Sequence, residues 1–263
     1  MSIDPIEQLS EPPAQRPFDA ARVEAAIREL LIGIGENPER EGLAQTPARV
    51  AKSYAEIFGG LHPDKKPSAS IFENKYKYGE MLVEKNIVVY STCEHHLLPI
   101  YGRAHIAYIS NGTVVGLSKM NRIVEYYAKR PQVQERLTIQ IVKELQSVLN
   151  TEDVACVIDA KHMCVNSRGI KDIESSTITA EFGGKFKEKE TKREFLDYIK
   201  YSVINNTTTY SEITEIINSS KSNVESANFD LINLIIANNF VVKDDIFRLV
   251  KEAPNRKFKI AEL

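Results

Sequence analysis

The 263-residue sequence has no tryptophan and only three cysteines. Three thiols are too few, and odd in number, for the disulfide framework on which small secreted domains depend. We therefore expect a reducing compartment, in which a cysteine thiolate serves as a metal ligand or a catalytic group. Hydrophobic residues at 43% and charged residues at 27% are typical of an ordinary globular protein.

The sequence also lacks an excess of charge and any long apolar run. Lys+Arg total 34 against 36 Asp+Glu, so no basic field attracts nucleic acid or membrane surfaces, and an anion site has to be local. No stretch reaches the roughly 18 apolar residues of a membrane span, and the N-terminus has no signal-peptide core. The sequence predicts a cytoplasmic protein with neither nucleic acid nor membrane as partner.

The first 80 residues divide into two parts. Residues 1–18 have little periodicity and are predicted to form a flexible arm. Residues 19–80 are predicted to be a helical region, because "DAARVEAAIRELLIGIGENPE" and "QTPARVAKSYAEIFGG" have apolar residues at helical spacing, with Asp19 and Thr46 as N-caps. Arg49 and Lys52 lie three residues apart on the second helix. Local sequence alone favours their interpretation as solvent-exposed surface residues.

Residues 81–202 are predicted to form an α+β domain with an antiparallel sheet. Two strands precede two helices, Asn111–Gly112 supplies a hairpin turn into "TVVGL", and Ser118 is placed to cap the first helix. The segments "DVACVIDAKHMCV" and "SSTITAEFGG" return to strand composition, so the order is ββααββ. Residues 203–263 are predicted to be a C-terminal extension with short amphipathic helices and no catalytic cluster.

The densest group of reactive side chains lies in "STCEHHLLPIYG". Cys93 and His96 are three residues apart, a spacing at which one turn directs a thiolate and an imidazole at a single ion. If "KHMC" is strand, His162 and Cys164 share a face. Cys93, His96 and Cys164 would then form a Cys₂His set with a fourth position open to water. The spacing does not distinguish His95 from His96 as the histidine ligand.

A site of this kind suits hydrolysis of a C–N bond. A zinc ion lowers the pKa of bound water toward about 7, and a free imidazole exchanges protons in the same range. A single histidine is more commonly just a hydrogen-bonded surface residue, but two Cys/His clusters at strand ends favour a metal site.

Further polar residues occur at helix starts. Lys119 and Arg122 follow Ser118, and Arg168 follows Cys164 by four residues. A helix N-terminus with nearby cations is a suitable binding site for phosphate. Each of these residues taken alone is better interpreted as a solvent-exposed surface residue. Glu135, next to Gln134, could accept two hydrogen bonds from the N1–H and amino group of guanine. Glutamate is also common in a first helical turn because of the helix dipole.

Four segments together resemble GTP cyclohydrolase I: "TPARVAKSYAEIFGGL", "STCEHHLLPIYGRAHIAYI", "VVGLSKMNRIVEYYAKRPQVQERLT" and "KHMCVNSRGI". The resemblance extends from about Asp19 to Lys200. It implies the tunnelling fold, in which the antiparallel sheets of neighbouring subunits join in a ring and two five-membered rings stack into a homodecamer. The segment 203–263 has no counterpart among these motifs, and we expect it to be a non-catalytic appendage.

The resemblance also implies a role for each candidate residue. The zinc ligands would be Cys93, His96 and Cys164. The proton-transfer groups would be His95, His162 and Ser118. The substrate-binding residues would be Ser118, Lys119, Arg122 and Arg168 for the triphosphate and ribose, Gln134 and Glu135 for guanine, and Arg49 and Lys52 from another subunit.

The implied reaction converts GTP and water to 7,8-dihydroneopterin triphosphate and formate, the first step of pterin and tetrahydrofolate biosynthesis. We expect metal-activated water to attack C8 of guanine while His162 protonates N7, with His95 and Ser118 assisting later steps. One alternative is a binding protein of the same fold with a structural or lost metal site. Another is a zinc nucleoside deaminase, but the Pro-Cys-x-x-Cys element of that class is absent. A nitrile reductase of the same fold would not need three zinc ligands.

Overall fold

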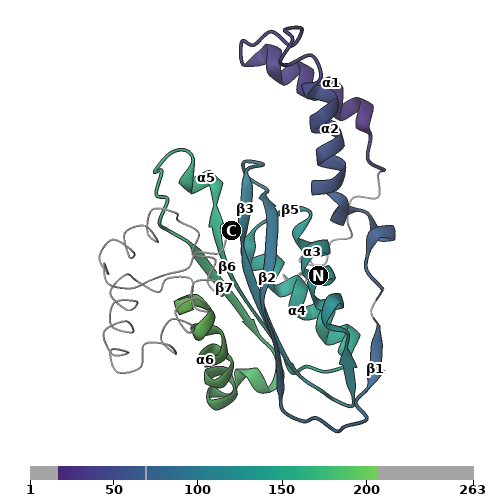
Figure 1. Cartoon of the computed structure of the whole chain (residues 1–263), viewed down its shortest axis with the longest axis vertical. Helices are drawn as coiled ribbons and strands as arrows, with labels where there is room; N and C mark the ends of the chain where they lie inside the picture. The colour runs from purple at the N-terminus through teal and green to yellow at the C-terminus, as the bar shows by residue number, and fades with distance from the viewer. Residues whose placement is uncertain (1–16, 69, 206–263) are drawn as a thin grey trace, which may run out of the picture. The chain divides into compact units, whose positions relative to one another are not determined.

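The computed structural model describes residues 17–68 and 70–205 (Figure 1). The predicted arm therefore falls almost entirely outside the described residues, and so does the predicted helical extension after residue 203. Among the described residues, no helix combines the length and apolar character needed to cross a membrane.

Two helices open the described chain, α1 (Ala20–Gly33) and α2 (Thr46–Ile57). The Asp19 carboxylate caps α1 by accepting a hydrogen bond of 2.9 Å from the backbone N–H of Arg22, as predicted. The prediction that Thr46 is an N-cap is wrong, because Gln45 occupies that position and Thr46 is already helical. Two short 3₁₀ helices, Gly59–Leu61 and Pro63–Lys65, lead away from α2.

A five-stranded sheet follows, and two helices connect its halves. The strand order is β5-β2-β3-β6-β7, with every pairing antiparallel except the short parallel contact of β5 with β2. This arrangement confirms the predicted α+β tunnelling fold. The elements are β2 (Met81–Cys93), β3 (Pro99–Ile109), α3 (Leu117–Ala128), β5 (Pro131–Gln132), α4 (Gln134–Leu149), β6 (Val154–His162) and β7 (Thr177–Phe182).

The predicted hairpin at Asn111–Gly112 does not form. Instead, β4 (Thr113–Val115) pairs with β1 (Ile71–Glu73) in a separate two-stranded sheet. The reason is that β2 and β6 already occupy both edges of β3, so no edge is left for β4.

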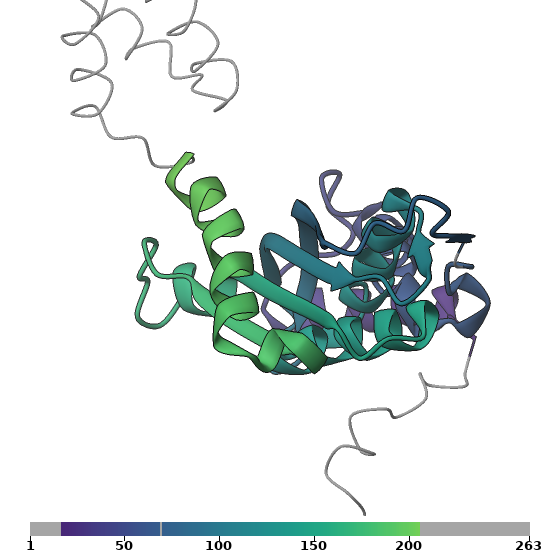
Figure 2. The ribbon, with the colours of Figure 1, turned by 90° about the horizontal axis from the view of Figure 1, so that it is seen from below.

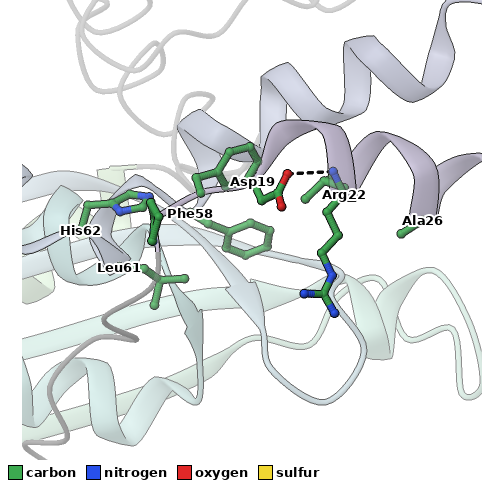
Figure 3. A pocket seen from close by; sticks show the side chains of 9 residues that line it. Asp19, Arg22, Ala26, Phe58, Leu61 and His62 are labelled. Carbon is green, nitrogen blue, oxygen red and sulfur yellow. Dashed lines mark hydrogen bonds between the residues drawn. The ribbon is translucent and has the colours of Figure 1, made fainter.

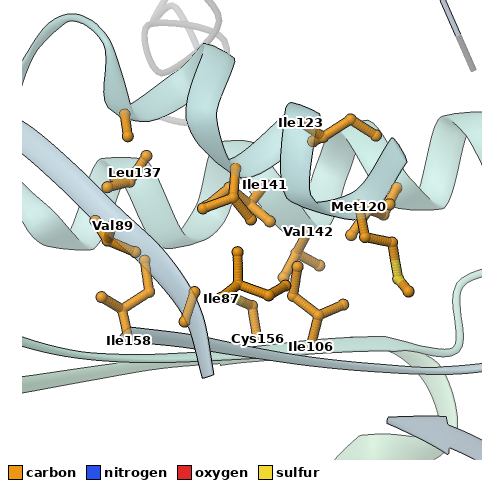
Figure 4. Close-up of a cluster of buried hydrophobic side chains, with 14 of the residues drawn as sticks. Ile87, Val89, Ile106, Met120, Ile123, Leu137, Ile141, Val142, Cys156 and Ile158 are labelled. Carbon is orange, nitrogen blue, oxygen red and sulfur yellow. The ribbon is translucent and has the colours of Figure 1, made fainter. Parts of the chain in front are cut away.

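The core lies between the sheet and the pair α3 and α4 (Figure 4). Val89 and Ile158 of the sheet and Ile141 of α4 are completely buried within it. A second apolar cluster lies on the other face, where Phe186 and Phe195 pack against the sheet. Phe195 belongs to α6 (Lys189–Asn205), which runs along that face (Figure 2). Both faces of the sheet are therefore held by helical segments.

The two ends of the sheet carry different elements. At one end, Thr92 pairs with Pro99 and Ile100 pairs with His162. The connection 94–98 and the one-turn helix α5 (Met163–Asn166) lie there, and we call this the turn end. At the opposite end Met81 pairs with Ile109. The 11 residues of β3 separate these ends by about 35 Å.

Candidate metal centre

The turn between β2 and β3 brings Cys93 and His96 together. The Cys93 N–H donates to the Leu98 carbonyl and the Leu97 N–H donates to the Cys93 carbonyl, both at 2.8 Å. Leu97 adopts a left-handed φ of 54°, which reverses the chain tightly. As a result, the Sγ atom of Cys93 lies 3.8 Å from Nδ1 of His96.

Cys164 completes the cluster, although not from a strand as the sequence predicts. The strand β6 ends at His162, and Cys164 lies on α5. One ligand atom from each of Cys93, His96 and Cys164 lies within 4.8 Å of the others. In a tetrahedral zinc site, sulfur and nitrogen ligands are separated by about 3.6 Å. The three residues therefore fit a single metal ion.

The electrostatics of the cluster favour a cation. Burial raises the pKa of the Cys164 thiol, and its contact with Cys93 raises that pKa further, whereas Arg168 opposes both effects. A divalent ion would remove the cost of holding two thiolates side by side. Cys93 is buried and His96 is exposed, so one side of the cluster is anchored in the core and the other is accessible.

Arg168 and His95 lie beside the cluster. The Arg168 guanidinium donates to Nε2 of His96 at 3.2 Å, which leaves Nδ1 of His96 facing Cys93. The His95 side chain is 65% exposed, and its ring centroid lies 6.3 Å from that of His96. Among the described residues, the clustered ligand atoms belong to His96 rather than to His95.

Gln134 and Glu135 begin α4 at the same end of the sheet. The Gln134 side chain is buried, and its Oε1 atom lies 2.8 Å from Nε2 of His162. Burial lowers the pKa of His162, and the negative charge of Glu135 acts in the opposite direction. Glu135 itself is exposed. His162, a proton-transfer candidate two residues before Cys164, is thus close enough to the Glu135 carboxylate to be affected by its charge.

An ion pair that the sequence did not reveal fixes the turn. Arg136 pairs with the Glu94 carboxylate, and also donates to Oε1 of Gln132 at 2.9 Å and to the Pro131 carbonyl at 3.0 Å. The Glu94 N–H donates to the Gln132 carbonyl at 3.0 Å. This network joins the turn to the first turn of α4. Glu94 and Arg136 are 42 residues apart, so no local pattern connects them.

The remaining predicted residues lie elsewhere in the chain. The helix α3 begins after β4, at the opposite end of the sheet, and it carries Ser118, Lys119 and Arg122 on its first turns. Gly116, not Ser118, is its N-cap. Arg49 and Lys52 are exposed on α2, which packs on α1 and the following 3₁₀ helix. A single chain therefore does not bring these basic residues to the metal cluster.

A separate groove of about 380 Å³ lies in the N-terminal helical region (Figure 3). Its walls include Phe58 and Leu61, and its carboxylate, Asp19, is engaged in capping α1. None of the predicted site residues lines it. The groove offers no chemistry comparable to that of the metal cluster.

The sequence of the chain matches one family of known proteins. The family model described as GTP cyclohydrolase I matches residues 23–200. The chain is 72% identical over 180 residues to GTP cyclohydrolase 1 of Flavobacterium johnsoniae, covering 68% of this chain and 81% of the relative. It is 50% identical over 184 residues to GTP cyclohydrolase 1 of Corynebacterium aurimucosum, covering 69% and 93%. It is 47% identical over 181 residues to that of Enterococcus faecalis, covering 68% and 97%.

Proposed function

Since the chain belongs to the GTP cyclohydrolase I family, we propose that it opens the imidazole ring of GTP and releases formate, forming 7,8-dihydroneopterin triphosphate for pterin and tetrahydrofolate synthesis. The observation that carries this proposal is the Cys93, His96 and Cys164 cluster, with His162 two residues from one of its members. Two thiolates and one imidazole are a ligand set that suits zinc.

Zinc is the metal that we propose for this cluster, held by Cys93, His96 and Cys164. Three protein ligands leave one coordination position open, and the ion supplies a Lewis acid that activates water at neutral pH. The partial exposure of the cluster supports access for a substrate from solvent.

The side chains around the cluster supply the proton transfers. When water adds to C8 of guanine, His162 takes a proton from that water and donates it to N7, which converts the C8=N7 double bond to a single bond. The C8–N9 bond then breaks as the new hydroxyl loses its proton and N9 gains one, and the imidazole ring opens. A second water molecule then releases the C8 carbon as formate. Ribose opening, the Amadori rearrangement and closure of the new ring follow with loss of one water, and we assign His95 and Ser118 to these proton transfers.

Charged residues bind the two ends of the substrate. Glu135, exposed at the start of α4, accepts hydrogen bonds from the N1–H and amino group of guanine. Arg168, within 3.2 Å of His96, is close enough to the cluster to neutralise a phosphate. We assign Lys119 and Arg122 to the triphosphate as well.

We further propose that the site is shared between subunits of a homodecamer. The separation between the turn end and the start of α3 supports this, because Lys119 and Arg122 lie on the first turns of α3, which begins at the end of the sheet opposite the metal cluster. Arg49 and Lys52 would reach the site from a further subunit. Most of β2 is paired on one side only, and β7 is an outer strand, so within the described chain both edges are open to pair with a neighbour.

Mixing two inactive variants tests the shared site. Cys164→Ser removes a metal ligand, whereas Arg122→Ala removes a phosphate contact. If the two halves of a site come from neighbouring chains, co-assembly in equal amounts restores about one quarter of wild-type activity, because both halves are intact at that fraction of random interfaces. No recovery in a mixed assembly would contradict a shared site.

The function itself is tested with purified, zinc-loaded protein and GTP. We expect formate and, after oxidation, a fluorescent pterin to appear in equal amounts. Metal bound without any turnover of GTP would contradict the proposal and would favour a binding protein of the same fold.

A further inference from the structure

The Gln134 side chain is only 1% exposed, although the resemblance implies that it contacts guanine. Its amide nitrogen donates to the Ile158 carbonyl at 3.0 Å, to the Thr177 carbonyl at 2.8 Å and to the Thr179 hydroxyl at 3.1 Å. An amide has two N–H groups. Both are therefore engaged by strands β6 and β7, which leaves no donor for a substrate.

These contacts also determine which nitrogen of His162 carries a hydrogen. A backbone carbonyl can only accept, so the Gln134 nitrogen has to face Ile158 and Thr177, and its oxygen Oε1 has to face His162. That oxygen can only accept as well. The 2.8 Å contact is consequently a hydrogen bond donated by Nε2–H of His162.

The acceptor is held firmly in place. The Thr179 hydroxyl, which accepts from the Gln134 amide, lies 2.6 Å from the Thr138 hydroxyl. The Thr138 hydroxyl donates to the main-chain carbonyl of Gln134 at 2.8 Å, so Thr179 is the donor in the contact between the two threonines. Thr138 and Gln134 are buried and Thr179 is half-buried, so most of this network between α4 and β7 is shielded from solvent. Buried networks with every member paired keep side chains in one orientation.

We propose that Gln134 is a positioning residue for His162. Its Oε1 atom holds the imidazole with Nε2–H directed inward, so Nδ1 is the nitrogen that exchanges a proton with the substrate. This inference rests on the proposed function, in which His162 protonates N7. It assigns the Gln134 side chain to His162 instead of to guanine, which is the role that the resemblance implies. Recognition of guanine then falls to Glu135.

The kinetic constants of Gln134→Leu distinguish the two roles. Loss of the acceptor should lower kcat by about 100-fold, within the roughly 10²–10⁴ that acid–base catalysis contributes, and leave KM for GTP within about threefold. Gln134→Glu retains an oxygen acceptor for Nε2–H and should recover part of kcat. Glu135→Gln is the comparison, and it should raise KM.

Thr179→Val is the matched control. It removes one partner of Gln134 and of Thr138 but leaves the hydrogen bond to His162. We expect its melting temperature to fall and its kcat to stay within about threefold of wild type. An equal fall of kcat in Thr179→Val and Gln134→Leu would overturn the proposal, and so would a raised KM with unchanged kcat in Gln134→Leu. If Gln134→Leu does not assemble, Gln134→Ala, which also lacks the side-chain oxygen, carries the same comparison.

Thermal unfolding separates failure of this inference from failure of the proposed function. In a double-mutant cycle of Gln134→Leu with His162→Ala, the fall in melting temperature should be smaller than the sum of the single falls, whether or not GTP is turned over. Additive falls would overturn the Gln134–His162 hydrogen bond. A wild-type protein with bound zinc but no formate release would overturn the proposed function instead.

Discussion

Arg136→Ala should weaken metal binding although Arg136 touches no ligand atom of the cluster. Its guanidinium holds Glu94, Gln132 and the Pro131 carbonyl, and thereby fixes the turn that contains Cys93. The side chains of Arg136 and Glu94 are 27% and 32% exposed, so solvent screens the pair only in part. Hydrogen bonds to charged groups contribute about 1.5–3 kcal/mol each, and after this screening we expect a total loss of about 2 kcal/mol. That loss corresponds to about 30-fold in zinc affinity, within the roughly 10–100-fold found when groups that support metal ligands are removed.

Competition with a chromophoric chelator measures this affinity directly. Arg193→Ala is the matched control, because Arg193 forms an ion pair with Asp197 on the exposed surface of α6, and we expect no change in zinc affinity. Arg136→Lys keeps the charge but not the planar fork, so its affinity should be intermediate. Zinc affinity within twofold of wild type in a folded, assembled Arg136→Ala protein would refute the reasoning, as would an equal loss in Arg193→Ala.

Three further predictions concern the fold and the C-terminal segment. Ile141→Ala, at a completely buried core position, should cost about 2–5 kcal/mol of unfolding free energy in chemical denaturation; an unchanged midpoint would contradict the assigned core. Gly102→Ala would place a Cβ atom 2.1 Å from the Asp159 carbonyl, so the circular dichroism spectrum should show loss of folded protein, and a native spectrum would count against the pairing of β3 with β6. Deletion of residues 203–263 should leave turnover of GTP largely intact, and complete loss in an assembled protein would refute a non-catalytic role.

Local sequence patterns predicted helices and strands well where neighbouring residues determine the structure. Asp19 caps α1 because a carboxylate before an amphipathic run can reach the first free N–H groups. The prediction of a hairpin at Asn111–Gly112 was wrong because its outcome depends on distant parts of the chain. Turn residues specify a chain reversal, but the partner of β4 depends on which strand edges remain free, and this is set by β2 and β6 from distant parts of the sequence.

The metal cluster could be predicted from residue types, but its geometry could not. The three-residue spacing of Cys93 and His96 is local, whereas Cys164 reaches them from a helical turn where a strand was expected. The pairing of Glu94 with Arg136 has no sequence signal, because the two residues approach only after α4 packs on the sheet.

The position of α3 shows how strand direction constrains a site. Because β2 and β3 are antiparallel, a helix that follows β3 begins at the end of the sheet opposite the turn. The proposed site groups Ser118 with the metal ligands in one pocket, and it is this arrangement of α3 that leads us to propose a second copy of the chain as the source of Ser118.

The most direct test of the account compares two cysteine variants by formate release from GTP per bound zinc. Cys164 belongs to the cluster, whereas Cys156 is completely buried in the core, where burial raises the pKa of its thiol. We predict that Cys164→Ser loses both zinc and formate release, and that Cys156→Ala keeps both. Formate release from GTP by a zinc-free Cys164→Ser protein would contradict the central claim.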